Sequence, residues 1–307
     1  MMLSSQSPRK VLVLAWQVGT QCLPRYASRF SRHTYTLPQL FACLVLRQFY
    51  NLSYRKAEAL LRDSPSWREA IELVGTPDHN TMCDAFDVIV RSEQVETMLD
   101  ELSAAFEKAG LLELNRKPLA IDSSCFESRH VSRHFERRKR DGKSESAVKS
   151  ERSATVKKLP KLAIAVAAGC HVILSAWSGT GAGADHPHFE QLLFDAWRRV
   201  AVTTVVADAG YDSERAHELA WQDMNLRSII PPRTGRPTDQ PPPQYFRRLM
   251  YDGFADGSLA EAYGQRWQAE TVNSMLKRNY GSALRARRPE AREREMLLKV
   301  LTHDIAL

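Results

Sequence analysis

Four side chains near the C-terminal end of the chain share one stripe of a predicted helix, which spans Tyr263 to Lys277. An α-helix turns about 100° per residue, so counted from Tyr263, Arg266 lies at about 300°, Glu270 at about 340° and Lys277 at about 320°. One carboxylate in line with two cations and a phenol is suited to bind a metal ion and a phosphate backbone together. A surface helix with spaced ion pairs is the alternative for this segment alone.

Two more carboxylates follow predicted strands upstream and favour the chemical interpretation. Pro118 to Asp122 reads as a short buried strand that ends in an acid, and Val202 to Asp208 is a β-branched strand that ends in a second one. Acids at strand ends lie where α/β sheets place their ligands. Together with Glu270 they form an oxygen-only set, which suits Mg²⁺ or Mn²⁺ rather than zinc.

These acids need a scaffold, and the chain changes pattern where it begins. Residues 1–35 are mixed in composition, and we do not predict an ordered element there. Residues 36–112 follow a helical period, and residues 113–307 alternate between strands and helices, with a basic, Ser-rich loop at 129–158. The predicted strands are 118–122, 162–168, 171–177, 202–208 and 226–231, and the predicted helices are 185–199, 213–223, 263–277 and 289–305. The fold class is therefore α/β, preceded by an all-helical domain. In the 263–277 helix, Val272 and Leu276 lie opposite the polar stripe and are predicted core residues.

The charge of the chain is concentrated in two places. The net charge is +7 and the isoelectric point about 9.2, yet residues 137–158 alone hold nine Lys or Arg against three acids, and residues 277–299 hold eight against three. A polyanion is the natural partner of such clusters, and nucleic acid is the commonest polyanion. A solvated loop and a charged helix face are the alternatives for each cluster taken alone.

Cysteine usage and hydropathy restrict the compartment. The five cysteines are scattered and contain no Cys-x-x-Cys pair, which indicates reduced thiols rather than disulfides or a zinc site. No apolar run of about 18 residues occurs, so no membrane partner is predicted. We expect a cytoplasmic protein.

Three motifs carry a family resemblance. They are Ile121-Asp-Ser-Ser124, Val206-Ala-Asp-Ala-Gly-Tyr-Asp-Ser213, and the spacing Tyr263-x2-Arg266-x3-Glu270-x6-Lys277. With them the chain resembles IS4/IS5-type bacterial insertion-sequence transposases of the DDE class, and the last spacing is the most specific of the three. The resemblance covers the chain from about Pro118 onward and implies an RNase H-like catalytic core with a mixed sheet.

The resemblance also implies an activity and roles for the site residues. Asp122, Asp208 and Glu270 would be catalytic and would hold two divalent metal ions, Mg²⁺ or Mn²⁺, that cleave the ends of a mobile element and join them to target DNA. The DNA-binding residues would be Arg266 and Lys277, which contact phosphates, and Tyr263, which positions the same strand. The partners would be the terminal inverted repeats and the target DNA, bound by a homodimer on the nucleoid of a bacterial cell.

Two other functions remain open at this point. The protein could be an RNase H-fold, metal-dependent nuclease that cuts without joining, or a catalytically inactive DNA-binding relic of a transposase. The helical region 36–112 could recognise DNA ends through a helix-turn-helix or could mediate dimerisation. Its candidate DNA contacts are Arg55, Lys56, Arg62, His79 and Asn80.

Three further residues have competing interpretations. Asp212 and Asp185 each precede a predicted helix, and we interpret both as helix caps rather than metal ligands. Trp267 is adjacent to Arg266, where it could stack on an extruded base or pack in a core or interface, and packing is slightly favoured.

Overall fold

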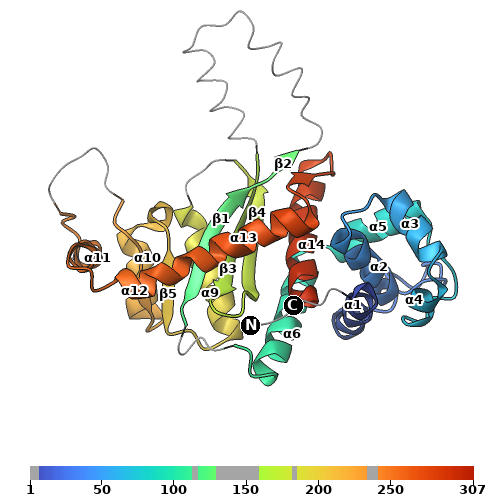
Figure 1. Ribbon diagram of the computed structural model, residues 1–307, viewed down its shortest axis with the longest axis horizontal. Helices are drawn as coiled ribbons and strands as arrows, with labels where there is room; N and C mark the ends of the chain where they lie inside the picture. The colour runs from blue at the N-terminus through green and yellow to red at the C-terminus, as the bar shows by residue number, and fades with distance from the viewer. Residues whose placement is uncertain (1–6, 113–116, 129–158, 182–184, 234–240) are drawn as a thin grey trace, which may run out of the picture. The chain divides into compact units, whose positions relative to one another are not determined.

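The computed structural model describes residues 7–112, 117–128, 159–181, 185–233 and 241–307 (Figure 1), so the basic loop predicted at 129–158 lies outside the described residues. The described chain is mixed α/β and divides into two compact units. One comprises residues 1–105 together with 275–307, and the other comprises residues 106–274.

The first unit is helical. Its elements are α1 (Pro8–Cys22), α2 (Leu37–Phe49), α3 (Tyr54–Arg62), α4 (Pro65–Glu69), α5 (His79–Ile89), most of α6 (Ser92–Lys108), the short β7 (Ala283–Leu284) and α14 (Pro289–Ala306). Helix α2 lies at the centre of the unit, because every residue from Leu37 to Gln48 is buried. Thr36 and Gln39 begin it with a reciprocal capping box. The second half of α14, from Glu295 to Ala306, is buried in the same way.

Residues 1–35, for which no ordered element was predicted, contain α1. The Ser7 side chain accepts a hydrogen bond from the Lys10 amide and Pro8 occupies the first turn, which are both helix-starting features. The buried residues Val11, Leu12, Ala15 and Val18 then follow a helical period. The apolar run alone is too short to reveal this helix, but the period extends beyond it. The helical unit also differs from the predicted 36–112 domain in that it includes α14 from the other end of the chain.

The second unit contains a mixed five-stranded sheet. Its elements are β1 (Leu119–Cys125), β2 (Glu127–Ser128), β3 (Pro160–Ala167), β4 (Ile173–Thr180), η1 (His186–His188), α9 (Phe189–Arg199), β5 (Thr204–Ala207), η2 (Ala209–Tyr211), α10 (Glu214–Glu218), η3 (Leu219–Asp223), β6 (Arg227–Ile229), α11 (Tyr245–Ala255), α12 (Ala260–Tyr263), η4 (Gly264–Arg266) and the start of α13 (Trp267–Tyr280). The strand order is β4-β3-β1-β5-β6. Strand β3 is antiparallel to both β1 and β4, whereas β1, β5 and β6 run parallel to one another. The five strands lie where the sequence predicts them.

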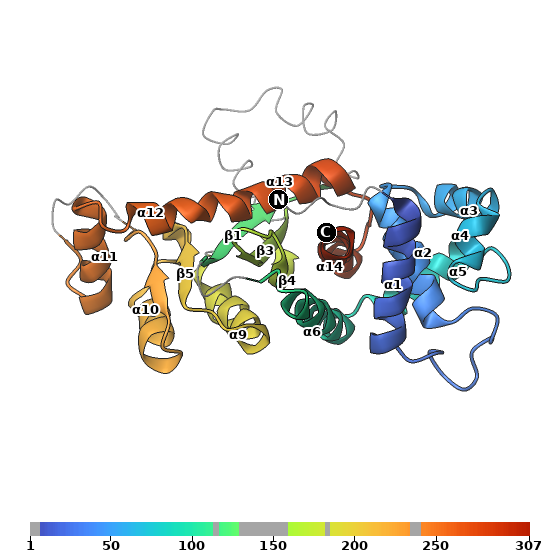
Figure 2. The same ribbon diagram turned by 60° about the horizontal axis from the view of Figure 1, so that its bottom comes forward.

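Helices cover both faces of this sheet (Figure 2). Helix α9 packs against β3 and β4 on one face, and α12, η4 and the first half of α13 lie on the other. Strand β3 is buried along its whole length, so the sheet forms the centre of the core. The last residue of β5, Ala207, pairs with Ile121 in the middle of the parallel strand β1, so Asp208 after β5 lies beside Asp122 of β1.

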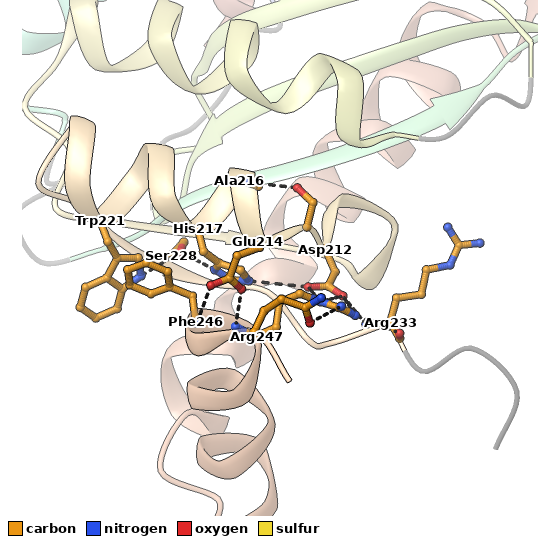
Figure 3. Close-up of polar contacts among 11 residues, drawn as sticks. Asp212, Glu214, Ala216, His217, Trp221, Ser228, Arg233, Phe246 and Arg247 are labelled. Atoms are coloured by element: carbon orange, nitrogen blue, oxygen red, sulfur yellow. Dashed lines mark hydrogen bonds and ion pairs between the residues drawn. The ribbon is translucent and has the colours of Figure 1, made fainter. Parts of the chain in front are cut away.

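A buried polar network ties α10 to α11 (Figure 3), a helix that the sequence analysis did not predict. The Asp212 carboxylate is fully buried and accepts hydrogen bonds from Arg247 at 2.8 to 3.1 Å and from the Arg233 amide at 2.7 Å. Glu214 accepts from the first amides of α11, those of Phe246 and Arg247. The interpretation of Asp212 as the cap of α10 is therefore wrong. Ser213 caps it instead, with its hydroxyl 3.1 Å from the Ala216 amide.

The same network contains a serine, a histidine and an aspartate in a row, and it is structural. The His217 ring lies 2.7 Å from the Ser228 hydroxyl and 3.7 Å from the Asp212 carboxylate. Both Ser228 and His217 are fully buried, and the indole of Trp221 already donates to the Ser228 hydroxyl at 2.9 Å. No substrate can reach such a serine, so we assign these residues to packing rather than nucleophilic catalysis.

Candidate active site

Asp122 lies in the middle of β1, where the strand becomes less buried; the strand continues to Cys125, so the prediction that it ends at Asp122 is wrong. The three residues before it are fully buried, whereas the Asp122 side chain retains 14% exposure. Its carboxylate accepts a hydrogen bond from the Asn273 side chain at 3.0 Å. Burial raises the pKa of Asp122 to about 6, and the negative charge of Asp208 adds to this rise against the opposing effects of Asn273 and Arg266. A nearby cation would stabilise the ionised form of this carboxylate.

Asp208 directly follows β5, the parallel neighbour of β1. Its carboxylate accepts a hydrogen bond from the Gly210 amide at 2.9 Å, which fixes it at the start of the η2 turn. A glycine is required at 210 for reasons of space, since a Cβ there would lie 2.9 Å from the Asp208 carboxylate. Asp122 and Asp208 therefore face the same edge of the sheet, close enough for one to alter the ionisation of the other.

Arg266 links the helical acid to the strand acid. Its guanidinium lies 2.5 Å from the Glu270 carboxylate and 4.0 Å from that of Asp122. Glu270 is half-exposed and Arg266 is mostly buried. The predicted stripe is thus present from Arg266 to Glu270, one helical turn apart.

Tyr263 packs beside the same guanidinium. The Arg266 guanidinium carbon lies 5.8 Å from the centre of the Tyr263 ring, and Phe254 contacts the ring edge-on at 5.0 Å. Burial raises the pKa of Tyr263, and the charges of Asp208 and Glu270 contribute to the rise. The phenol therefore lies near both acids and stays protonated, available as a hydrogen-bond donor.

The helix that carries Glu270 is less regular than predicted. It is broken into α12, the tight turn η4 and α13, with Arg266 at the end of the turn. Val272 and Leu276 are fully buried, as predicted. Lys277 lies further along α13, within the residues grouped with the helical unit, and is half-buried.

Trp267 is 54% exposed, so it does not pack in the core, whereas packing in an interface stays a prediction. An indole exposed beside Arg266 is available to stack on a ligand.

Two polar residues of the site were missed or assigned another role. Asn273 was not singled out, although it lies three residues after Glu270 and so on the same helix face. Asp185 was interpreted as a helix cap, but its carboxylate makes no capping bond. It accepts a hydrogen bond from the Ser123 hydroxyl at 2.7 Å and forms an ion pair with the buried amine of Lys161.

The Lys161–Asp185 pair lies on the opposite face of the sheet from Asp122. It contacts the segments that carry Asp122 and Asp208. Successive side chains of a strand point to opposite faces, so Ser123 lies on the other side of β1 from Asp122. The second carboxylate oxygen of Asp185 lies 3.0 Å from the position of a Cβ at Gly210. Asp185 thus touches both the residue after Asp122 and the turn that holds Asp208.

Comparisons with known families agree with this geometry. Residues 114–305 match the family described as Transposase DDE domain, and residues 11–87 match the one described as Transposase domain (DUF772). The chain belongs to the DDE transposase family. No curated protein and no solved structure matches it significantly. The family implies phosphodiester chemistry on DNA with divalent metal ions, and the matched residues 114–305 include Asp122, Asp208 and Glu270.

The donor set of the transposase fits a hard divalent cation in kind. Asp122, Asp208 and Glu270 offer carboxylate oxygens, and neither thiol nor imidazole lies among them. Within the described residues, however, no group of three His, Cys, Asp or Glu side chains lies close enough together to hold a metal ion. Glu270 is paired with Arg266 instead. Of the three carboxylates, Asp122 and Asp208 are thus the two that the structure brings together.

None of the described helices is both long and apolar enough to cross a lipid bilayer.

Proposed function

We propose that this protein is the transposase of an IS4/IS5-type insertion sequence, which cleaves the ends of its element and joins them to target DNA. The observation that carries the proposal is that Asp122 in β1 and Asp208 directly after the parallel strand β5 lie side by side, with Glu270 on a helix across one sheet face. The match to the DDE family supports it. The sheet order, with β3 antiparallel to both of its neighbours and β1, β5 and β6 parallel to one another, supports an RNase H-like core.

Asp122, Asp208 and Glu270 would hold two divalent ions, Mg²⁺ or Mn²⁺. When bound, such ions lower the pKa of a water or a DNA 3′-hydroxyl and stabilise the leaving oxygen of a phosphodiester. Burial, with a smaller contribution from the charge of Asp208, raises the pKa of Asp122, and a cation between the two carboxylates would stabilise both in the ionised form, which supports this assignment. Glu270 joins the set when its ion pair with Arg266 opens.

The chain's own residues would orient the DNA. Arg266 already lies between two carboxylates, so a phosphate that arrives with a metal ion would compete for its guanidinium and release Glu270. Tyr263 can donate a hydrogen bond to the same strand. Lys277 would bind a phosphate further along it, and Trp267, exposed beside Arg266, would stack on a base. Two element ends must be held for joining, so we propose a homodimer on DNA.

An assay of cleavage and strand transfer tests the proposal. The substrate is labelled DNA that carries the inverted repeats flanking the gene, with Mg²⁺ or Mn²⁺, and the variants are Asp122→Asn and Glu270→Gln. The matched control is Asp252→Asn, whose carboxylate is exposed and pairs only with its helix neighbour Arg248 among the contacts described. We expect metal-dependent nicking at the repeat boundary and joined products, lost in both site variants and kept in the control.

Other outcomes would select another function. Cutting without joining would favour a metal-dependent nuclease. Binding without cutting, by the wild type with either metal, would favour an inactive relic. Full activity of Glu270→Gln would remove the helical acid from the mechanism.

A further inference from the structure

The N-terminal part of the chain is more basic than the net charge of the whole chain indicates. Glu58 is the first acidic residue, and eight Lys or Arg precede it. Three of these cations, Arg25, Arg29 and Arg32, fall in the connection between α1 and α2, which spans residues 23–36 and is called here the α1–α2 loop. This loop runs out from α1 as the blue segment before α2 (Figure 2).

Aromatic rings alternate with the cations of the α1–α2 loop. The Arg29 guanidinium lies 4.7 Å from the centre of the Phe30 ring, and that of Arg25 lies 5.5 Å from the Tyr26 ring. Tyr26 in turn stacks on His33, with ring centres 4.2 Å apart and an angle of 21° between the planes. Phe30 has no such cover, because its side chain is 82% exposed. An exposed phenyl among cations is a poor surface for an apolar protein partner and a good one for a charged, planar ligand.

Hydrogen bonds hold the α1–α2 loop in shape although its side chains are exposed. The Ser28 amide donates to the Ser31 hydroxyl at 3.0 Å, and the Phe30 amide donates to the Ser28 hydroxyl at 3.3 Å. At its base, the Leu37 amide donates to the Arg25 carbonyl at 2.9 Å. A loop ordered before binding loses less conformational entropy when it binds.

The surface predicted from sequence for end recognition is less suited to DNA. Arg62 on α3 and His79 on α5 both contact the carboxylate of Glu58, at 2.5 and 2.9 Å. The charge of Arg62 is thus partly neutralised, and the His79 ring already has a partner. Helices α3 and α5 are also separated by residues 63–78, which contain α4, rather than by the short turn of a helix-turn-helix.

We infer that the α1–α2 loop is a DNA-contact surface of this protein. Arg25, Arg29 and Arg32 bind backbone phosphates, and Phe30 stacks on a base that is not paired in a duplex. The inference rests on the proposed function, since a transposase must hold the termini that it cuts, and terminal base pairs fray. It adds to that function by naming the surface and the form of DNA that the surface selects.

Fluorescence anisotropy with the full-length protein tests the inference. The probes are a labelled blunt duplex and the same duplex with an unpaired fork at one end, titrated over a series of salt concentrations. In the triple variant Arg25→Ser/Arg29→Ser/Arg32→Ser, we expect weaker binding to both probes and a slope of log affinity against log salt that is shallower by about 3. The matching Arg→Lys triple variant keeps the charge and should keep the slope.

Phe30→Ala separates stacking from charge. We expect about 5- to 100-fold weaker binding to the forked probe and unchanged binding to the blunt one. Val74→Ala is the matched control, since Val74 is an apolar side chain of the same unit and is 99% exposed. It should bind both probes as the wild type does.

A second control tests the alternative surface. Arg55→Ser/Lys56→Ser removes two exposed cations of α3. A loss of binding in this variant, with wild-type affinity and salt slope in the loop variants, would overturn the inference. So would a loop triple variant that binds DNA normally but changes the mass of the protein in light scattering, because the loop would then contact another protein chain.

Failure of the inference is distinguishable from failure of the proposed function. If the wild type binds DNA through the loop but cleaves nothing with either metal, the inference stands and the transposase activity does not. If the wild type cleaves and joins, and the loop variants bind and react as it does, the activity stands and the inference is refuted.

Discussion

Replacing Arg247 by methionine should destabilise the sheet-containing unit strongly. The Asp212 carboxylate has no exposed surface, and Arg247 supplies three of the contacts to its oxygens, at 2.8, 2.9 and 3.1 Å. Arg247→Met leaves a buried carboxylate with the Arg233 amide and a distant His217 ring. Breaking a buried ion pair on one side costs about 3–5 kcal/mol. For a unit of this size each kcal/mol corresponds to about 2–4 °C, so we expect the melting temperature to fall by about 6–20 °C.

The neighbouring arginine provides the control. Arg248 pairs with Asp252, but both side chains are about half exposed, and such a pair contributes at most about 1 kcal/mol. Thermal and urea unfolding of Arg247→Met and Arg248→Met, followed by tryptophan fluorescence, compares the two pairs directly, because Trp221 lies in the Asp212 network. Equal stability of the two variants would refute the reasoning.

The pH dependence gives an independent test of the same network. Burial favours the protonated form of Asp212, but the His217 ring nearby and the hydrogen bonds from Arg247 and the Arg233 amide outweigh it and lower the pKa below the ordinary 3.8. A carboxyl with a lowered pKa stabilises the folded state above 3.8, and that stability is lost as the pH falls through its folded pKa. The difference in stability between wild type and Arg247→Met should thus be large at pH 7 and shrink below about pH 4. A constant difference would contradict the assignment.

Two further predictions concern Asp122 and Asp208. Gly210→Ala places a Cβ within 3.0 Å of the carboxylates of both Asp208 and Asp185, so we expect it to abolish cleavage while DNA binding in a mobility-shift assay is kept; undiminished cleavage would show that the turn yields easily. Asn273→Leu removes a hydrogen bond that lowers the pKa of Asp122. The acidic limb of the pH–rate profile for cleavage should then move upward by about one pH unit, and a downward shift would contradict the assignment.

Much of the sheet could be predicted because its signals are local. Val202 to Asp208 is a run of β-branched residues of strand length, and the observed strand β5 lies within it. The contact between Arg266 and Glu270 follows from helical spacing alone. That Asp122 and Asp208 lie side by side follows from the parallel pairing of β1 and β5, although β1 extends beyond Asp122 to Cys125. The roles of these residues in DNA cleavage remain predictions.

The features that were missed depend on partners far away in sequence. Helix α11 follows a Pro-rich segment, and Glu214, which accepts from its first amides, comes from another helix. Asp185 has a capping position in sequence, but Lys161 and Ser123 attract its carboxylate more strongly than its own backbone does. Such pairings leave no periodic pattern in the sequence, so they could not be predicted from it.

The helical unit is assembled from both ends of the chain, which has a consequence during synthesis. Helices α1 and α2 leave the ribosome early, but α14, which packs against both, begins about 240 residues after the end of α2. At about 5–20 residues per second, the face of α2 that α14 covers waits roughly 10–50 s for its partner. The sheet-containing unit, which is continuous in sequence, can fold in that interval. The first domain to be translated is therefore the last to be completed, and its uncovered helices are a natural substrate for chaperones.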